Sequence, residues 1–121
     1  IPQRAFYGRE HLIDVEFHDG IEIIEKWAFK GCILLRSVKL LGVKIIGEGA
    51  FSFCGLTDVE FGVELETLGA CALLNCTSLT SLTMPSVKAI GGYAFSNCRQ
   101  LTDLDLPDGL ETIEQSAFQY C

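Results

Sequence analysis

Positively charged residues are scarce in this chain. Nine Lys and Arg stand against sixteen Asp and Glu, giving a formal charge of -7 over 121 residues. A chain of this charge repels the phosphate backbone of nucleic acids and anionic lipid headgroups. Long apolar runs are also missing: none reaches the roughly 18 to 20 residues of a membrane-spanning helix, and no basic-then-apolar signal segment opens the chain. The sequence therefore predicts neither a nucleic-acid partner nor a membrane span.

Residues that carry catalysis or bind metals are equally few. His11 and His18 are the only histidines, and both flank a predicted strand as surface residues. No serine or cysteine stands in a nucleophile motif such as G-x-S-x-G, and Gly91-Gly92 lacks the spacing of a phosphate-binding loop. Zinc sites commonly draw on C-x-x-C pairs, and the chain has none. We therefore expect no enzyme activity, no metal and no cofactor.

The chain does contain an internal repeat. Its hydrophobic content of 49% is too high for a disordered chain. The dipeptide Ala-Phe, once Ala-Leu, recurs at spacings of 23, 22, 22, 22 and 23 residues, beginning at Ala5, Ala28, Ala50, Ala72, Ala94 and Ala117. Aliphatic residues fill the positions four and seven residues before these alanines. Such self-similarity predicts a stack of coils that share one core.

A second block of each repeat has the pattern of a strand. Residues 12–17, 35–40, 56–61, 79–84 and 101–106 read Leu-x-x-Val/Leu-x-apolar. Alternation such as Val15-Glu16-Phe17 sends apolar side chains to one face of a strand and charged ones to the other. Stacking these segments about 4.8 Å apart would form a parallel sheet over a continuous core.

Cysteine also recurs once per repeat, three residues after each Phe or Leu of the dipeptide. These residues are Cys32, Cys54, Cys76, Cys98 and Cys121, with Arg9 in the first copy. Residues three apart share a helical face, so we expect each Ala-Phe-x-x-Cys segment to form a short helical turn. Parallel Cβ vectors about 4.8 Å apart exceed the roughly 3.5–4.5 Å that disulfides prefer. We predict a structural column of buried thiols that act as small hydrophobes and weak donors to carbonyls.

Two further positions leave alternatives open. Cys71 lies outside the column, at a place held in other copies by Trp27, Gly49, Tyr93 and Ser116, which suggests an exposed position that tolerates any residue type. An inert, partly covered Cys71 and a reactive or intermolecular thiol are both compatible with this placement. Asn75-Cys76-Thr77 matches the glycosylation sequon, although its middle residue is predicted to be buried. The localisation, at the cell surface, secreted or cytoplasmic, stays open.

Residues 84–98, Met-Pro-Ser-Val-Lys-Ala-Ile-Gly-Gly-Tyr-Ala-Phe-Ser-Asn-Cys, and the similar run 101–121 resemble the BspA-like class of leucine-rich repeats. The departures are local, such as Leu73 for Phe and Arg9 for Cys. Together with the repeats, this resemblance predicts an α/β repeat solenoid. The expected form is a right-handed leucine-rich-repeat superhelix with a parallel concave sheet and short helical turns on the convex side. We expect residues 1–121 to be a single array of about five coils, a fragment of a longer solenoid with partial repeats at both ends.

Membership of this class implies binding, adhesion or scaffolding, because a fold does not fix a function. We predict a non-catalytic protein-binding module of adhesin, receptor or scaffold type. An acidic concave sheet would face a protein partner with a basic surface, since charge of one sign steers the opposite charge. A face that is only solvated remains the competing interpretation. The predicted concave-face residues are Asp14, Glu16, Lys39, Asp58, Glu60, Thr83, Asp103 and Asp105.

The alternative function is a structural spacer or assembly element. In that case the solenoid ends and the convex face would make the contacts, and uncapped ends would allow self-association. Trp27 and Tyr93 are the candidate convex contacts, because exposed aromatic residues are enriched in interfaces. Both rings could instead cover a neighbouring coil.

Overall fold

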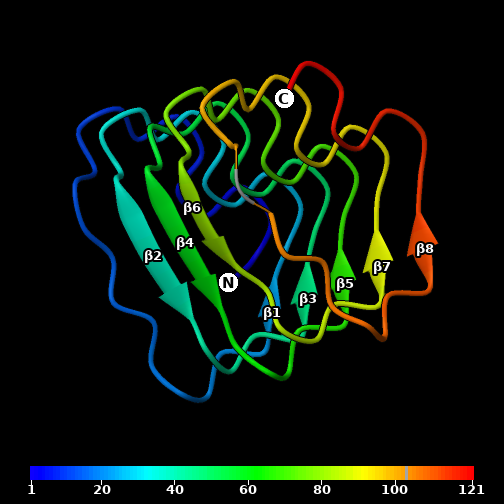
Figure 1. Cartoon of the computed structure of the whole chain (residues 1–121). Coiled ribbons are helices and arrows are strands. Elements are labelled where there is room, and N and C mark those ends of the chain that lie inside the picture. Colours follow the sequence, from blue (N-terminus) through cyan, green and yellow to red (C-terminus); the bar gives the residue numbers. More distant parts are fainter. Residues whose placement is uncertain (103) are drawn as a thin grey trace.

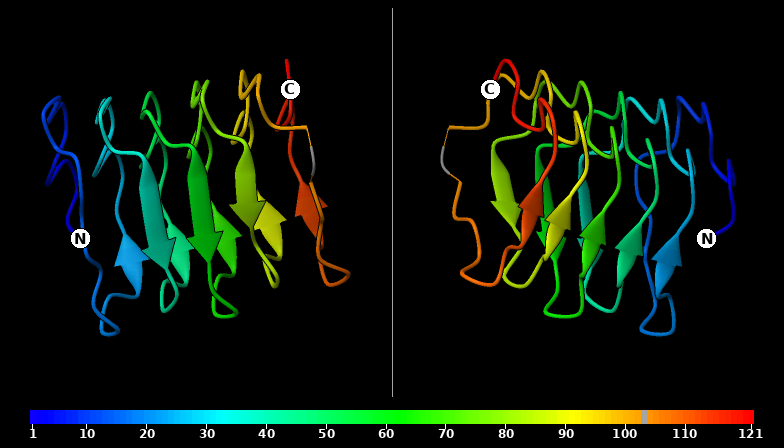
Figure 2. Two further views of the ribbon diagram at one scale, coloured as in Figure 1. Left: turned by 60° about the vertical axis from the view of Figure 1, so that its left-hand side comes forward. Right: turned by 90° about the vertical axis from the view of Figure 1, so that its right-hand side faces the viewer.

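The chain forms a parallel β-solenoid (Figure 1). The computed structural model describes residues 1–102 and 104–121. Within these residues, eight short strands form two parallel sheets that lie on different sides of the coils (Figures 1 and 2). One sheet has the order β2-β4-β6 and the other β1-β3-β5-β7-β8. From β1 to β8 the chain makes about four turns.

The first sheet confirms three of the five predicted strands: β2 (Ser37–Leu40), β4 (Asp58–Phe61) and β6 (Ser81–Thr83). Ser37 pairs with Asp58, which pairs with Ser81. Val38 and Val59 are buried while Ser37 and Asp58 are exposed, as the period of two requires.

The prediction of strands was wrong for residues 12–17 and for the described part of 101–106. Thr57 and Thr80 add side-chain hydrogen bonds between the coils whose strands do pair. The amide and the hydroxyl of Thr57 donate to the Arg36 carbonyl at 2.7 and 3.1 Å, and those of Thr80 donate to the Thr57 carbonyl at 2.9 and 3.2 Å. Arg36 holds the same place in the preceding coil and has no hydroxyl; its guanidinium donates to Ile33 and Gly55 instead. Alternation fixes the inward face but does not by itself produce pairing, because residues 101–106 carry a threonine at the same place, Thr102, and their described part forms no strand.

The second sheet was not predicted, although its residues belong to the aliphatic columns. Its strands are β1 (Ile23–Ile24), β3 (Ile45–Ile46), β5 (Thr67–Leu68), β7 (Ala89–Ile90) and β8 (Thr112–Ile113). Each has two residues, which is too short for a period to be recognised. Just before these strands, charges of alternating sign lie in a row across the coils, at Glu22, Lys44, Glu66, Lys88 and Glu111. Neighbouring like charges are thereby avoided, and Lys44 Nζ lies 3.3 Å from Glu22 Oε1.

The prediction of helical turns was also wrong, because no described residue is helical. Each coil instead has a six-residue turn segment: 4–9, 27–32, 49–54, 71–76, 93–98 and 116–121. The first and fifth residues of every segment have a positive φ; Trp27 has 59° and Gly31 has 81°. An α-helix needs right-handed angles at every residue, so two left-handed residues four apart exclude it.

Along each turn segment, backbone hydrogen bonds to a neighbouring coil alternate with bonds inside the same coil. The amides of Trp27, Phe29 and Gly31 donate to carbonyls of the next coil at 2.8–2.9 Å. The amides between them donate within their own coil to the residue three positions earlier. Every second backbone group therefore ties one coil to the next, as in a sheet.

The core between the sheets is built from columns of repeated residues. The rings of Phe29 and Phe51 stack with centroids 5.1 Å apart and planes 3° apart, and Phe95 stacks on Phe118 in the same way. Each thiol of the cysteine column donates to a carbonyl in the preceding coil, as Cys54 Sγ does to Phe29 at 3.0 Å. That carbonyl also accepts the Cys32 amide, so both of its lone pairs are used.

Candidate functional site

The outward side of β2, β4 and β6, which we call the outer face, carries two rows of polar side chains. Ser37, Asp58 and Ser81 form one row, and Lys39, Glu60 and Thr83 form the other. Glu60 is half-buried and the others are exposed. Because the parallel ladder fixes the backbone, these side chains stand about 4.8 Å apart without further ordering.

The outer face is less uniformly acidic than the sequence pattern suggested. Among described residues, β4 supplies two acids, β2 one lysine and β6 no charge. Asp105 is exposed but lies outside any strand, and Asp103 lies outside the described residues. The structure therefore brings Lys39, Asp58, Glu60 and Thr83 together in one sheet.

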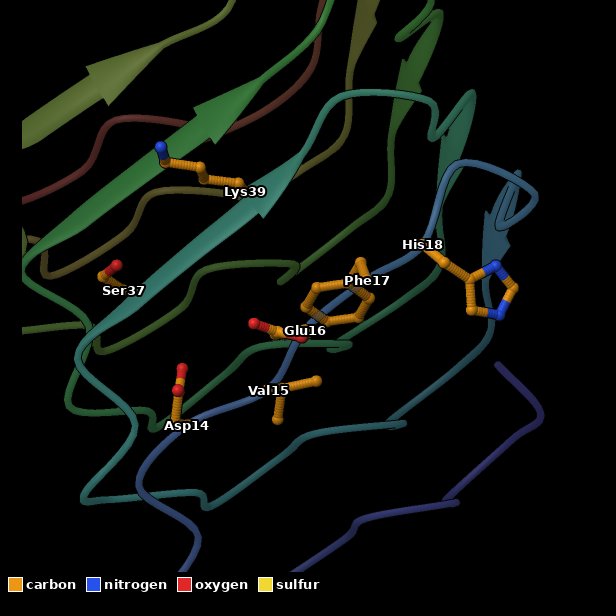
Figure 3. Close-up of a pocket in the computed structure, with 7 residues that line it drawn as sticks. All are labelled: Asp14, Val15, Glu16, Phe17, His18, Ser37 and Lys39. Carbon is orange, nitrogen blue, oxygen red and sulfur yellow. The ribbon is translucent and has the colours of Figure 1, made fainter.

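Asp14 and Glu16 are exposed beside this sheet, across an open groove (Figure 3). The groove has a volume of about 570 Å³. It is lined by Asp14, Val15, Glu16, Phe17 and His18 on one side and by Ser37 and Lys39 of β2 on the other. Val15 and Phe17 are half-buried and pack on the core, whereas the two carboxylates are exposed. The groove thus combines a partly apolar floor with charged rims.

The turn segments form a second surface feature, which we call the aromatic–cation cluster. The Arg4 guanidinium lies 4.6 Å and Lys26 Nζ 4.3 Å from the centre of the Trp27 ring. Lys30 lies within 5.8 Å of the rings of Tyr7, Trp27 and Phe53. Contacts of this kind contribute roughly 0.5–1 kcal/mol each at exposed sites.

Trp27 and Tyr93, the predicted convex contacts, are not brought together. They hold the same position three coils apart, with Gly49 and Cys71 between them. Trp27 is half-buried and covers Gly49, where an added Cβ would lie 2.6 Å from Trp27 Cδ1. Tyr93 is 40% exposed. Trp27 therefore covers a neighbouring coil, and Tyr93 remains accessible.

The predicted thiol column is confirmed, with burial as predicted at four of its five members. Cys32, Cys54, Cys76 and Cys98 are buried, and Cys121 is exposed yet donates to Phe95 O at 3.1 Å. Burial raises the pKa of Cys98 to about 12 and also raises the pKa of Cys76. The hydrogen bond with Cys32 and burial raise the pKa of Cys54. Thiolates are the reactive form, so Cys54, Cys76 and Cys98 are suited to packing, whereas the hydrogen bond with Cys54 lowers the pKa of Cys32.

Cys71 is half-buried, and burial followed by the charge of Glu48 raises its pKa. The expectation that its position tolerates any residue type was incomplete, because all five described side chains and the glycine there take a left-handed φ. Asn75 is half-buried, and its Oδ1 accepts a 2.5 Å hydrogen bond from Asn97 Nδ2. The sequon's middle residue, Cys76, is fully buried, as predicted.

Residues 1–102 and 104–121 contain no group of three or more His, Cys, Asp or Glu side chains placed to hold a metal ion. In the same residues there is no helix of the length and hydropathy needed to cross a membrane.

Comparison with known proteins identifies the family of this repeat. A model of the BspA type leucine-rich repeat region matches residues 1–121 in six copies. The chain belongs to this family. BspA-type repeats are generally non-catalytic. No curated protein matches the chain.

Two solved leucine-rich repeat proteins are similar to this BspA-type array. One, from Bacteroides ovatus, is 28% identical over 97% of this chain with a TM-score of 0.91. The other, from Eubacterium ventriosum, is 24% identical over 90% of it with a TM-score of 0.65, and shows the fold alone. The chain spans 31% and 37% of these two proteins, respectively.

Sequence reasoning missed the groove and the aromatic–cation cluster. The repeat alignment held a signal for the cluster, because Arg4 and Trp27 occupy one column and Tyr7 and Lys30 another. Stacked coils place such neighbours side by side. No sequence signal marked the groove, because residues 12–17 carry the same strand pattern as the later copies.

Proposed function

We propose that this array is a non-catalytic protein-binding module of adhesin, receptor or scaffold type, and that the outer face recognises a protein with a basic surface. The observation that carries the proposal is the register of β2, β4 and β6, which holds two rows of exposed polar side chains at fixed spacing. A surface ordered before binding loses little conformational entropy when a partner docks.

The charge of the site supports a basic partner. Asp14, Glu16, Asp58 and Glu60 outnumber Lys39 among the described residues of the outer face and the groove beside it. Screened charges of one sign steer opposite charge over roughly a Debye length, about 8 Å at physiological ionic strength. Association should therefore weaken as salt is added.

The test compares protein capture by the wild type and by an outer-face variant with Asp58→Lys and Glu60→Lys. Its matched control carries Glu64→Lys and Asp108→Lys, exposed positions with the same change in net charge. We expect a basic protein to be retained by the wild type and the control and released by the outer-face variant. Equal retention by all three folded proteins would reject the outer face as the site.

An assembly role through the convex side is the second candidate. Its supporting observation is the exposed apolar surface beside the aromatic–cation cluster, where Tyr7, Ile33 and Phe53 are 44–50% exposed. Sedimentation of the wild type and of a Tyr7→Ser/Phe53→Asn variant tests it: self-association that the variant loses would favour this role over the first.

A further inference from the structure

The edge of β2 that faces residues 14–18 carries unpaired backbone groups. The pairing of Ser37 with Asp58, and the Asp58 amide bond to the Arg36 carbonyl, direct the backbone groups of Arg36 and Val38 toward β4. Alternate residues of a parallel strand present their groups to opposite sides. The amides and carbonyls of Ser37 and Lys39 therefore point toward residues 14–18.

Those four groups find no partner in the neighbouring coil. Residues 12–18 and 35–40 are all described, and no backbone hydrogen bond joins the two segments. The next two interfaces, by contrast, have a full parallel ladder from Ser37 through Asp58 to Ser81. An open strand edge of this kind is a template for a further strand.

The groove beside that edge has the features an extended chain would need. Its volume of about 570 Å³ lies between the edge and residues 14–18. In Figure 3 the side chains of Asp14 and Glu16 lie between their own segment and β2, while Val15 points away from them. Charged and apolar side chains thus alternate along residues 14–17, on the side of the groove opposite β2, with the period of a strand.

We propose that this groove binds an extended peptide segment of the partner by adding it as a strand to the edge of β2. Backbone hydrogen bonds to Ser37 and Lys39 hold the segment. Its basic side chains face the carboxylates of Asp14 and Glu16, and its apolar side chains, one residue on, pack against Val15 and Phe17. The inference rests on the proposed protein-binding function and narrows the partner to a segment with alternating basic and apolar residues.

Amide hydrogen exchange tests the open edge in the protein itself. We expect the Ser37 and Lys39 amides to exchange rapidly in the free chain while the Val38 amide is protected by β4. Adding an acetylated five-residue peptide of alternating lysine and valine should slow exchange at Ser37 and Lys39 and leave Val38 unchanged. Protection of Ser37 and Lys39 in the free monomer would overturn the proposal, because residues 14–18 would then already occupy the edge.

Two isomeric peptides test the strand pairing. One peptide carries N-methyl groups on the amide nitrogens that would face β2, which removes those donors. Its isomer carries them on the amide nitrogens in between, which leaves the donors that face β2 intact. We expect one isomer to bind about tenfold more weakly than the parent or worse, since roughly two backbone hydrogen bonds are lost, while the other binds nearly as well. Equal affinity of both isomers and the parent would overturn strand addition.

Protein variants separate this inference from the proposed function. Asp14→Asn with Glu16→Gln should weaken binding of the lysine–valine peptide, and a glutamate–valine peptide should not bind. If no peptide binds while capture still depends on Asp58 and Glu60, the outer face functions without strand addition and only this inference fails. If sedimentation shows that a dimer protects Ser37 and Lys39, the occupant is a second copy and the peptide proposal is wrong.

Discussion

At the residue scale, the inward phenylalanine Phe51 is held by both of its neighbouring coils. The Phe51 ring stacks on Phe29 at 5.1 Å, its amide donates to Ala72 O and its carbonyl accepts the Cys76 thiol. The backbone around the ring is thus tied on both sides. A cavity made there cannot collapse, because collapse would break hydrogen bonds to two coils.

We expect Phe51→Ala to lower the free energy of unfolding by ~3–5 kcal/mol, measured by urea denaturation. The matched control is Phe53→Asn. Phe53 is 44% exposed with a φ of 59°, and the next coil has Asn75 at the same left-handed place, so this change should stay within about half a kcal/mol. Similar losses in both variants would contradict the core position of Phe51.

At the element scale, the turn segments depend on left-handed residues. Ser116 has a φ of 58°, a conformation that costs an L-residue roughly 1–2 kcal/mol and glycine very little. We expect Ser116→Gly to raise the thermal stability or leave it unchanged. Gln119→Gly, in the same segment with no positive φ, should lower stability by about 0.5–1 kcal/mol. Destabilisation by Ser116→Gly of the same size as Gln119→Gly would contradict the left-handed assignment.

The thiol column should make stability depend on alkaline pH. Burial raises the pKa of Cys98 from 9.0 to about 12, so the folded chain holds this proton more tightly than the unfolded chain. The resulting stabilisation is complete below about pH 9 and is lost as the pH rises toward 12. We expect the difference in unfolding free energy between the wild type and Cys98→Ala to narrow from pH 9 to 12. A constant difference across that range would mean that the Cys98 thiol is not shifted in the folded state.

At the scale of the whole molecule, contacts are made between adjacent coils, as the pairing order of both sheets shows. Stability in such a stack is close to a sum over coils and their interfaces. The secondary structure of the assembled chain is strands and turns, with no helix among residues 1–102 and 104–121.

Far-ultraviolet circular dichroism should therefore show a spectrum of strand and turn without the double minimum of a helix. Unfolding in urea should remove this spectrum and supplies the baseline for comparison. A helical double minimum in the folded chain would contradict the turn segments described above, because their alternating hydrogen bonds leave no place for a helical ladder.

The sequence by itself determined the repeat, the inward columns and the thiol column. Each of these depends on a side chain's hydrophobicity or size at a fixed spacing, and coils of 22 or 23 residues bring equal positions into contact. The repeat therefore places Phe29, Leu73 and Cys76 in the core. The outward direction of Lys39 and Asp58 followed from the same alternation.

Only the tertiary structure decided the backbone of each coil and the shape of the candidate site. Residue type does not predict the left-handed φ of Trp27 and Tyr93, since residues of many types occupy that place. The unpaired edge of β2 reflects the absence of backbone hydrogen bonds between residues 12–18 and 35–40, although residues 12–17 carry the same strand pattern as residues 35–40. Spacing along the chain fixes which residues meet, whereas the bonds between their backbones are settled by how the coils stack.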